Sequence, residues 1–506
     1  MVEKEMPLVE AIDGFLKKEY AYFAIPGHRY ESGMPPSLRE RFGPAVYRYD
    51  LTEAPGLDDL HHAKGAILKA RKRAAELFGA DECRFSVNGT TALIEAMILS
   101  VCAPGDELIL ARDVHRSAVS GLILSGAKPV WIMPDGDPEW NVSNGIKPER
   151  VEEAILSHPE AKAVLVVSPT YYGQASDLAA IAGICHSHGM ALLVDAAHGS
   201  HFRFSDAYPA DAVSAGADLT AMSLHKTTGA MTQSSMLFYK KNDPKPVSME
   251  RLDAALRMTI SSSPSYVLMA SLDAARQQLF ENGEQMAEEA IEKALDLRRA
   301  LSEIPGVKVR GGSDLFSLIR REQDVTRVVF CVPGLSGTKL AESLEKEGNT
   351  VIEMADARNA VAVVTSANTR QDILKLSMAV MNASRDPARE EETSRSRCAS
   401  FGDDANECEK SRSRYPMFGD DDAKDPEMVL SPRDAFFAEK EELPVSETIG
   451  RICADMICPY PPGIPVLVPG EQISEKEIRF LEEMVRLGIP VQGMSEEERI
   501  WVLKSN

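Results

Sequence analysis

The chain has 506 residues, of which 44% are hydrophobic and 26% are charged, as in a globular protein with room for more than one domain. Its 56 basic and 77 acidic residues give a net charge of −21, which argues against a nucleic-acid-binding protein because such proteins need a basic surface. No stretch approaches the roughly 20 apolar residues of a membrane helix, and the N-terminus lacks the apolar core of a signal peptide. Eight scattered cysteines form no paired CxxC motif. We therefore expect no metal site, no membrane partner and a cytoplasmic location, or an organelle such as the plastid if a transit peptide has been removed.

Short apolar runs alternate with helical patterns between residues 83 and 240. Apolar runs without polar alternation are typical of strands buried on both faces of a parallel sheet, and intervening helices give repeated βαβ units. Helices are predicted between several strands, at 90–101, 148–157 and 177–188. The predicted strands are 83–87, 107–111, 128–133, 163–167, 191–195, 219–223 and 236–240. The pattern predicts an α/β domain built on one large, mostly parallel seven-stranded sheet.

A smaller α+β unit follows this sheet. Residues 284–303 have the spacing of a long amphipathic helix. Strands are expected at 306–310, 326–332 and 360–366, and helices near 337–347 and 370–382. Residues 384–428 then hold 8 basic and 13 acidic residues and no valine, isoleucine or leucine. Such a segment cannot bury enough apolar surface to offset its ordering entropy, so we expect a disordered acidic insertion over 384–440.

Four polar features fall where strands of the predicted sheet meet their connections. Lys226 follows strand 219–223, Asp195 ends strand 191–195, and His115 follows strand 107–111. The run NGTT leads from strand 83–87 into a helix, where free backbone N–H groups and two hydroxyls could bind an anion. Each feature alone has an ordinary structural explanation. Together, at the sheet edge where α/β folds bind ligands, they favour pyridoxal phosphate, because its protonated ring nitrogen would pair with a buried acid. The glycine-rich motifs of nucleotide sites are absent from the sequence.

The sequence resembles the bacterial-type ornithine/lysine/arginine decarboxylases, which are pyridoxal-phosphate enzymes of the aspartate-aminotransferase fold (fold type I). The resemblance covers nearly the whole chain apart from 384–440. It rests on the motifs FAIPGHR, DLTEAPGLDDLHH, NGTTA, VHRSAVSGLILSGA, SPTYYG, D-x-A-H-G, S-x-H-K, TQSSML, SSSPSYVLMASLDAAR and PYPPGIPVLVPGE. Ala196 and Leu224 depart from the family's usual D-E-A-H-G and S-T-H-K. Only some 20 residues precede FAIPGHR, so we expect a short form without the N-terminal receiver-like domain.

The resemblance implies a role for each matched residue. Lys226 would carry the cofactor, Asp195 would pair with its ring nitrogen, and His115 would stack on its ring, and these three are the predicted catalytic residues. Ser263 would reach the phosphate from the neighbouring subunit of a homodimer or larger assembly. Glu471 would meet the substrate's distal cation, with Glu53 and Asp58 as weaker candidates. The remaining predicted cofactor contacts are Thr90, Thr91, Thr170, His198, Ser223 and His225.

The implied activity is decarboxylation of arginine, lysine or ornithine to agmatine, cadaverine or putrescine, through an aldimine on Lys226 and a quinonoid intermediate. The alternatives are another enzyme of fold type I, either an aminotransferase or a carbon–sulfur lyase, or a non-catalytic regulatory paralogue. The predicted division is an N-terminal arm (1–35), a cofactor-binding major domain (36–283), a small α+β domain (284–383), the insertion (384–440) and a C-terminal segment (441–506). The sequence leaves open which of the three cations is preferred.

Overall fold

The computed structural model describes residues 5–242, 247–320, 322–385 and 427–504. Its centre is a seven-stranded sheet in the order β1-β9-β8-β7-β6-β2-β3, in which β9 alone runs against the other six strands. The strands are β1 (Glu82–Ser86), β2 (Glu107–Ala111), β3 (Lys128–Ile132), β6 (Ala163–Val167), β7 (Ala191–Asp195), β8 (Leu219–Ser223) and β9 (Ser235–Tyr239). The predicted α/β fold with a mostly parallel seven-stranded sheet is therefore confirmed.

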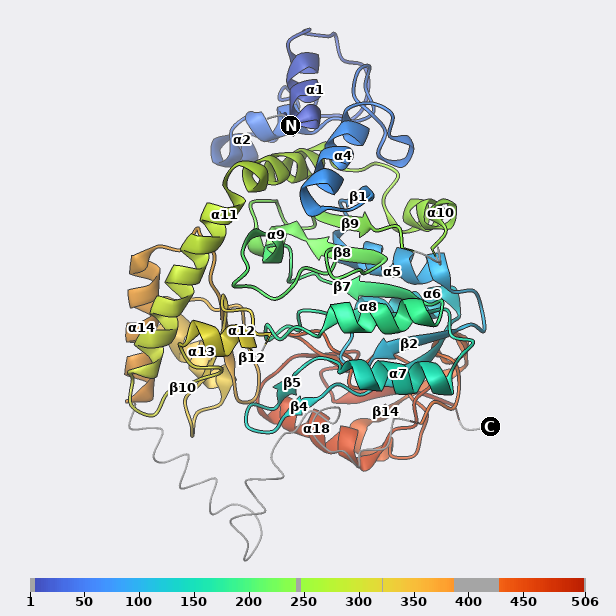
Figure 1. The fold of residues 1–506 in the computed structure, drawn as a ribbon, viewed down its shortest axis with the longest axis vertical. Coiled ribbons are helices and arrows are strands. Elements are labelled where there is room, and N and C mark those ends of the chain that lie inside the picture. The colour runs from blue at the N-terminus through green and yellow to red at the C-terminus, as the bar shows by residue number, and fades with distance from the viewer. Residues whose placement is uncertain (1–4, 243–246, 321, 386–426, 505–506) are drawn as a thin grey trace, which may run out of the picture.

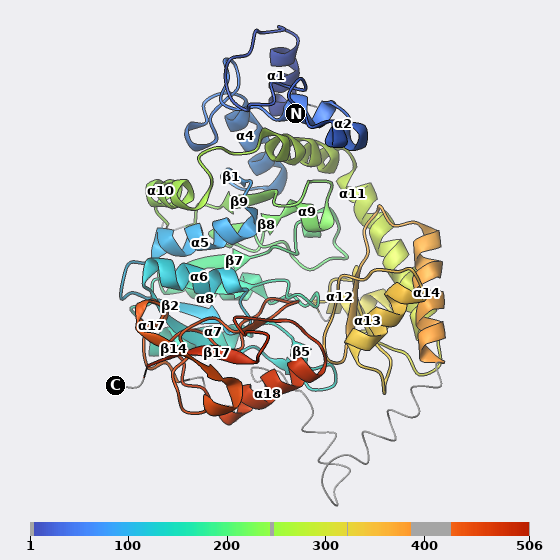
Figure 2. The same ribbon diagram turned by 180° about the vertical axis from the view of Figure 1, so that it is seen from behind.

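Helices cover both faces of this sheet, as the unbroken apolar strands require. Every residue of β7 and β8 is buried. Figure 1 shows α7 and α8 in front of the sheet, and Figure 2 shows α5 and α6 on the opposite face, with α10 packed against α5. The helices of this layered unit are α4 (Ala66–Phe78), α5 (Gly89–Val101), α6 (Arg116–Ser125), α7 (Pro148–Ser157), α8 (Leu178–Ser187), α9 (Leu224–Thr227) and α10 (Met249–Thr259).

One long helix, α11 (Tyr266–Ser302), joins the large sheet to the second unit (Figure 1). The predicted start at residue 284 is wrong. Ser265 caps the helix by accepting a hydrogen bond from the Leu268 N–H, and the helix continues through Gly283. A Cβ at Gly283 would lie 2.4 Å from the Phe204 ring, so glycine serves here for close packing and does not end the helix. The proposed domain boundary at 283/284 thus falls within a continuous helix.

The second unit is an antiparallel four-stranded sheet in the order β10-β11-β13-β12. Its strands are β10 (Lys308–Val309), β11 (Arg327–Cys331), β12 (Met354–Ala355) and β13 (Ala360–Val363), shorter than expected at β10 and β13. The helices of this unit are α12 (Leu315–Arg320), α13 (Gly337–Lys346) and α14 (Arg370–Ser384), and α14 packs against α11.

The two ends of the chain lie at opposite ends of the molecule (Figure 1). The N-terminal part packs α1 on α4 and α11. It contains α1 (Pro7–Leu16), α2 (Pro36–Phe42), α3 (Ala45–Tyr49) and the 3-10 turn η1 (Leu60–His62). The C-terminal part pairs β14 with β17 and β15 with β16. It contains α17 (Pro432–Phe437), β14 (Lys440–Pro444), η3 (Val445–Glu447), β15 (Cys458–Pro459), α18 (Glu475–Arg486), β16 (Val491–Gln492) and β17 (Arg499–Leu503).

The structure contradicts both ends of the disordered insertion predicted over 384–440, because Ser384 is the last residue of α14 and residues 427–440 make defined contacts. Residues 386–426 lie outside the described residues, but 427–440 are folded. Ser431 caps α17 by accepting a hydrogen bond from the Asp434 N–H, and Arg433 donates to the Leu124 carbonyl oxygen at the end of α6. Val429 donates its backbone N–H to the Gly470 carbonyl oxygen. These anchors come from segments distant in sequence, so local composition did not reveal them. No helix in the described ranges has the length and apolarity needed to cross a bilayer.

Candidate active site at the carboxyl edge of the large sheet

A cavity of about 410 Å³ lies where β2, β6, β7 and β8 end and α5 begins. Residues of the second unit and of the C-terminal segment close its other side, through Glu353 and Tyr460. The structure brings nine of the predicted cofactor residues into its lining, namely Thr90, Thr91, His115, Thr170, Asp195, His198, Ser223, His225 and Lys226. Ser263 and Glu471 do not line it.

One end of the cavity combines a helix N-terminus with a cluster of hydroxyls. α5 begins at Gly89, whose φ of +73° favours glycine, and the first backbone N–H groups of a helix have no partner within the helix. Thr90 Oγ1 lies 2.5 Å from Ser223 Oγ and 2.9 Å from Ser235 Oγ. His225 donates from Nδ1 to the Ser234 carbonyl oxygen over 3.1 Å, which leaves Nε2 available. Such an arrangement of donors binds phosphate.

Asp195 supplies a buried carboxylate at the end of β7. Its Oδ1 accepts the Ala197 N–H over 3.1 Å. Burial raises the pKa of Asp195 above its ordinary range, while the Lys226 ammonium and the Ala197 N–H act in the opposite direction. A carboxylate in this position is stabilised by a cationic partner, and a protonated ring nitrogen would supply one.

Lys226 follows β8 on the short helix α9 and points to His198. The distance from Lys226 Nζ to His198 Nε2 is 2.8 Å, and His198 Nδ1 lies 2.8 Å from Arg327 Nη2. Burial, followed by the charges of Lys226 and Arg327, lowers the pKa of His198 well below its ordinary value. Burial is also the largest cause of a lowered pKa for Lys226. The site therefore holds a neutral imidazole beside an amine that loses its proton more easily than a solvated lysine does.

His115 is held at the N-terminus of α6 as its capping residue. Its Nδ1 accepts the Ser117 N–H over 3.2 Å and lies 2.9 Å from Ser117 Oγ. The pKa of His115 is lowered to about 4, first by burial and then by the charges of Lys226 and Arg116. Gly463 packs against the ring, because a Cβ at this residue would lie 3.3 Å from His115 Cδ2. The ring is thus neutral at physiological pH and fixed in orientation.

Two acidic residues of the cavity were missed in the sequence. Asp113, two residues before His115, is buried, and its Oδ2 accepts the Ser143 hydroxyl over 2.5 Å while Oδ1 has no hydrogen-bond partner among the described residues. Burial raises the pKa of Asp113 to about 6. Glu353 enters from the second unit and accepts the Tyr171 hydroxyl over 2.5 Å. Position after a strand could have indicated Asp113, whereas no local motif marks Glu353.

The structure contradicts the predicted position of Glu471 at the site entrance. Glu471 is fully buried, and its Oε2 lies 3.0 Å from Arg112 Nη2, which is also fully buried. The same oxygen accepts the Val468 N–H over 2.7 Å. Glu471 thus anchors the C-terminal segment inside the protein, and its match to the family motif reflects this structural role.

The two weaker acidic candidates also lie outside the cavity lining. Asp58 accepts backbone N–H groups from residues 59, 64, 65 and 68, which gives it a role in turn structure. Glu53 is exposed. Ser263 is exposed in its own chain, and its contact with the phosphate of a second subunit stays a prediction.

The residues present fit pyridoxal phosphate. The hydroxyls and helix N-terminus suit its phosphate, Asp195 suits its ring nitrogen, and the neutral His115 offers a ring face between them. The described residues contain no group of three or more His, Cys, Asp or Glu side chains that could hold a metal ion.

Two family models match the chain. Orn/Lys/Arg decarboxylase, major domain, matches residues 6–318, and Orn/Lys/Arg decarboxylase, C-terminal domain, matches residues 417–497. The arginine decarboxylase of Bacillus subtilis (strain 168) is 36% identical over 495 residues, which cover 97% of this chain and 96% of that protein. The arginine decarboxylase of Halalkalibacterium halodurans is 36% identical over 497 residues, or 98% and 96% of the two chains. The structure of lysine decarboxylase A from Pseudomonas aeruginosa superposes with a TM-score of 0.83 at 20% identity, over 98% of this chain and 80% of that one, which shows a shared fold.

Proposed function

The chain belongs to the Orn/Lys/Arg decarboxylase family and is an amino-acid decarboxylase, and from this premise we propose that it converts arginine to agmatine with pyridoxal 5'-phosphate as cofactor. One observation carries the proposal. The phosphate-binding end, Asp195, His115 and Lys226 all line the same cavity at the carboxyl edge of the large sheet.

Particular residues would hold the cofactor. Thr90, Thr91, Ser223 and His225 would bind its phosphate, Asp195 its ring nitrogen and His115 a face of its ring, while the Lys226 amine would bond to its aldehyde carbon. When bound, pyridoxal phosphate supplies an electron sink for the pair of electrons left at Cα as carbon dioxide departs.

The protein's own groups supply charge and proton control. Asp195 holds a proton on the ring nitrogen, because the buried carboxylate is stabilised by that cation. Burial lowers the pKa of Lys226, so its ammonium gives up a proton more readily than that of a solvated lysine. Lys226 is therefore suited to transfer a proton at Cα. His198, neutral and 2.8 Å from Lys226 Nζ, orients that amine.

The cavity also offers acidic groups for the far end of a basic substrate. Asp113 has a buried carboxylate, one oxygen of which has no partner within the described part of the chain, and Glu353 carries a second carboxylate on the side of the second unit. The charge of Glu353 raises the pKa of Lys226, so this carboxylate acts on the reacting amine. A guanidinium presents several N–H donors in a planar fork that matches carboxylates. The 36% identity to proteins named arginine decarboxylase supports arginine over lysine or ornithine.

An aminotransferase would need an arginine of the small domain to hold the substrate carboxylate. Arg327 is the small-domain arginine that approaches Lys226, but it is buried, donates to His198 Nδ1 and does not line the cavity. This position disfavours the aminotransferase alternative.

The function is tested by incubating the purified enzyme, with pyridoxal phosphate and no keto acid, separately with arginine, lysine and ornithine. We expect release of carbon dioxide and formation of agmatine with arginine in large preference. Lys226→Ala should lower turnover by orders of magnitude. A keto-acid requirement would identify an aminotransferase, and a protein that never becomes yellow with the cofactor would identify a non-catalytic paralogue.

We further propose that the active unit is a homodimer in which Ser263 acts on the partner's cofactor phosphate. The exposed position of Ser263 outside its own cavity supports this arrangement. Mixing inactive Lys226→Ala with inactive Ser263→Trp should restore activity, since one site of each hybrid dimer retains both native residues. If mixtures stay inactive while hybrids form, Ser263 acts within its own chain.

A further inference from the structure

We propose that Arg327 is a positioning residue that sets the tautomer of His198 and thereby holds the Lys226 amine unprotonated. This inference rests on the proposed role of Lys226 in bonding the cofactor. Arg327 belongs to β11 of the second sheet, whereas His198 and Lys226 follow strands β7 and β8 of the large sheet. The contact between them therefore lets the second unit control the protonation of Lys226.

The argument begins with the donors around His198. A guanidinium only donates hydrogen bonds, so His198 Nδ1, 2.8 Å from Arg327 Nη2, must accept. A neutral imidazole then carries its single proton on Nε2. His198 Nε2, 2.8 Å from Lys226 Nζ, therefore donates to that amine. Only an unprotonated amine has the lone pair to accept, and it is also the form that attacks an aldehyde carbon.

Asp324 fixes the backbone of Arg327 and interacts electrostatically with its guanidinium. Asp324 is fully buried, and its backbone carbonyl oxygen accepts the Arg327 N–H over 3.2 Å. Its Oδ1 accepts the Thr326 N–H and hydroxyl over 2.9 and 2.7 Å, and its Oδ2 lies 3.3 Å from His201 Nε2. His201 and, to a smaller extent, Arg327 help lower the pKa of Asp324 to about 2 against the effect of burial. We call these residues the Arg327–Asp324–His201 array.

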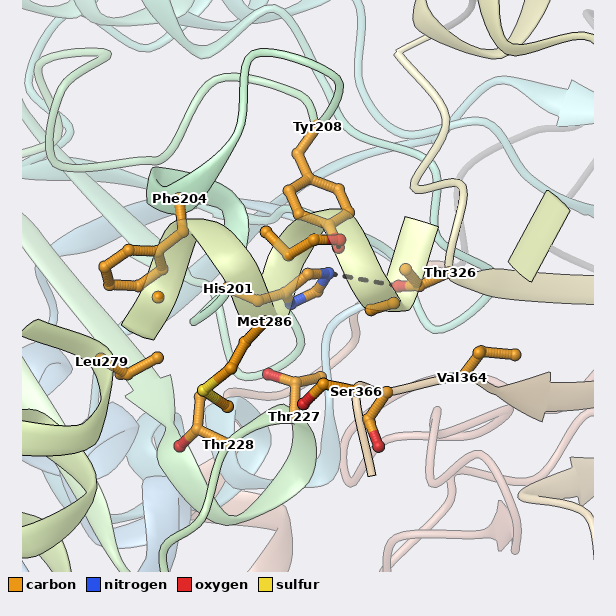
Figure 3. Close-up of a pocket in the computed structure, with 14 residues that line it drawn as sticks. His201, Phe204, Tyr208, Thr227, Thr228, Leu279, Met286, Thr326, Val364 and Ser366 are labelled. Carbon is orange, nitrogen blue, oxygen red and sulfur yellow. Dashed lines mark hydrogen bonds between the residues drawn. The ribbon is translucent and has the colours of Figure 1, made fainter. Parts of the chain in front are cut away.

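The array is seated between the two units. Figure 3 shows His201 beside Tyr208 with its contact to Thr326, whose hydroxyl lies 3.3 Å from His201 Nε2. A cavity of about 20 Å³ adjoins it, between α9, α11 and the ends of the second sheet. Gly173, with φ of +84°, lets the Arg327 stem pass, because a Cβ there would lie 2.5 Å from Arg327 Cβ. The SPTYYG loop therefore needs a glycine at this position, because the Arg327 side chain passes directly beside it.

Other charged groups also act on the Lys226 amine. Asp195 and Glu353 raise the pKa of Lys226, while burial and Arg327 lower it. His115 is neutral at physiological pH and lies near His198. Arg327 therefore acts on Lys226 in two ways in the same direction, through its charge and through the proton on His198.

The test measures the Lys226 amine without substrate or cofactor. Labelling of Lys226 by acetic anhydride is followed against pH by mass spectrometry in the full-length apoprotein, which gives its pKa. Arg327→Met should raise that pKa by about one unit or more, so that labelling below it slows about tenfold. Arg327→Lys, which keeps a cationic donor, should restore at least half of the difference. Arg327→Leu, which likewise lacks a donor and a charge, serves the same comparison if Arg327→Met does not fold.

A double-mutant cycle separates the tautomer from the charge. In a His198→Phe background, the shift caused by Arg327→Met should be clearly smaller than in the parent. Equal shifts in both backgrounds would overturn the inference, as would an unchanged labelling profile in folded Arg327→Met. Arg71→Lys is the matched control, because Arg71 is another buried arginine but lies on α4 and donates to the Cys83 carbonyl oxygen, away from the cavity lining. Lys226 labelling should not change in that control. Failure to decarboxylate arginine would refute the proposed function without altering these labelling results.

Discussion

Replacing Asp113 by asparagine should make the protein more stable and less active. The substitution keeps the shape of the side chain, and the Ser143 hydroxyl can still donate to the amide oxygen, as it does to Asp113 Oδ2. It removes a buried charge, one oxygen of which accepts no hydrogen bond from the residues that the structure describes. If Asp113 served only in packing, the same substitution would not raise stability while lowering activity.

The gain in stability follows from the pKa. Burial raises the pKa of Asp113 from its ordinary value of 3.8 to about 6, so the folded protein prefers the neutral carboxyl. The shift of about two units corresponds to on the order of 3 kcal/mol. This penalty is absent below pH 3.8, grows as pH rises from 3.8 through 6, and is complete above about pH 7. Asp113→Asn should therefore raise the free energy of unfolding by on the order of 3 kcal/mol at pH 7.5 and by less at pH 5.

The loss in activity follows from the substrate's far cation. A hydrogen-bonded charge pair with a buried carboxylate contributes about 2–3 kcal/mol when one partner is neutralised. That range corresponds to about 30- to 150-fold in kcat/KM for arginine. In the parent enzyme, kcat/KM should also fall as pH drops through 6, because Asp113 gains a proton there. Asparagine has no such proton to gain, so this pH dependence should flatten in the variant.

The assays are urea unfolding at pH 5 and 7.5 and kcat/KM for arginine between pH 5 and 8. Cofactor binding, measured by absorbance, serves as the control and should not change, because Asp113 is assigned to the far end of the substrate. A variant that is less stable than the parent at pH 7.5 would refute the electrostatic reasoning. A variant with parental kcat/KM would move the recognition of the far cation to Glu353.

Three further substitutions test other parts of the structure. Asp195→Asn should retain the phosphate contacts and bind the cofactor, measured by absorbance, yet lose most of its turnover because the ring nitrogen is no longer held protonated. Arg112→Met should lower the free energy of unfolding in urea by about 3 kcal/mol and leave kcat/KM per folded molecule unchanged, because it leaves the fully buried Glu471 carboxylate without its cationic partner. Asp324→Asn should cost on the order of 2.5 kcal/mol at neutral pH, since the pKa of Asp324 is lowered to about 2, and its difference from the parent in unfolding free energy should vanish as pH falls from 3.8 through 2.

Local pattern was enough to predict the large sheet and the residues that follow its strands. The apolar runs could be read as buried strands because both faces of a parallel sheet are covered, and each of the seven was placed within a residue or so of its observed bounds. Lys226, Asp195 and His115 were found because parallel strands deliver the residues at their ends to one edge. Because they lie at the same edge of the sheet, these three residues line one cavity.

Predictions failed where a contact joins distant segments. The motif around Glu471 was recognised, but its pairing with Arg112 spans 359 positions, and no local pattern shows that a carboxylate will be buried against a particular arginine. The close packing of Gly283 against Phe204, within the continuous helix α11, is likewise a contact between distant segments.

The α/β fold class, the family resemblance and the residues at the carboxyl ends of the large-sheet strands could be predicted from the chain alone, because they depend on local periodicity, short motifs and strand direction. That Asp113 and Glu353 face the cavity, and that Arg327 reaches His198 from another sheet, is seen only in the folded arrangement. Burial, charge and hydrogen-bond partners at these positions arise from groups brought together by folding, and the chemistry of an ionisable side chain is set by those neighbours and not by its position along the chain.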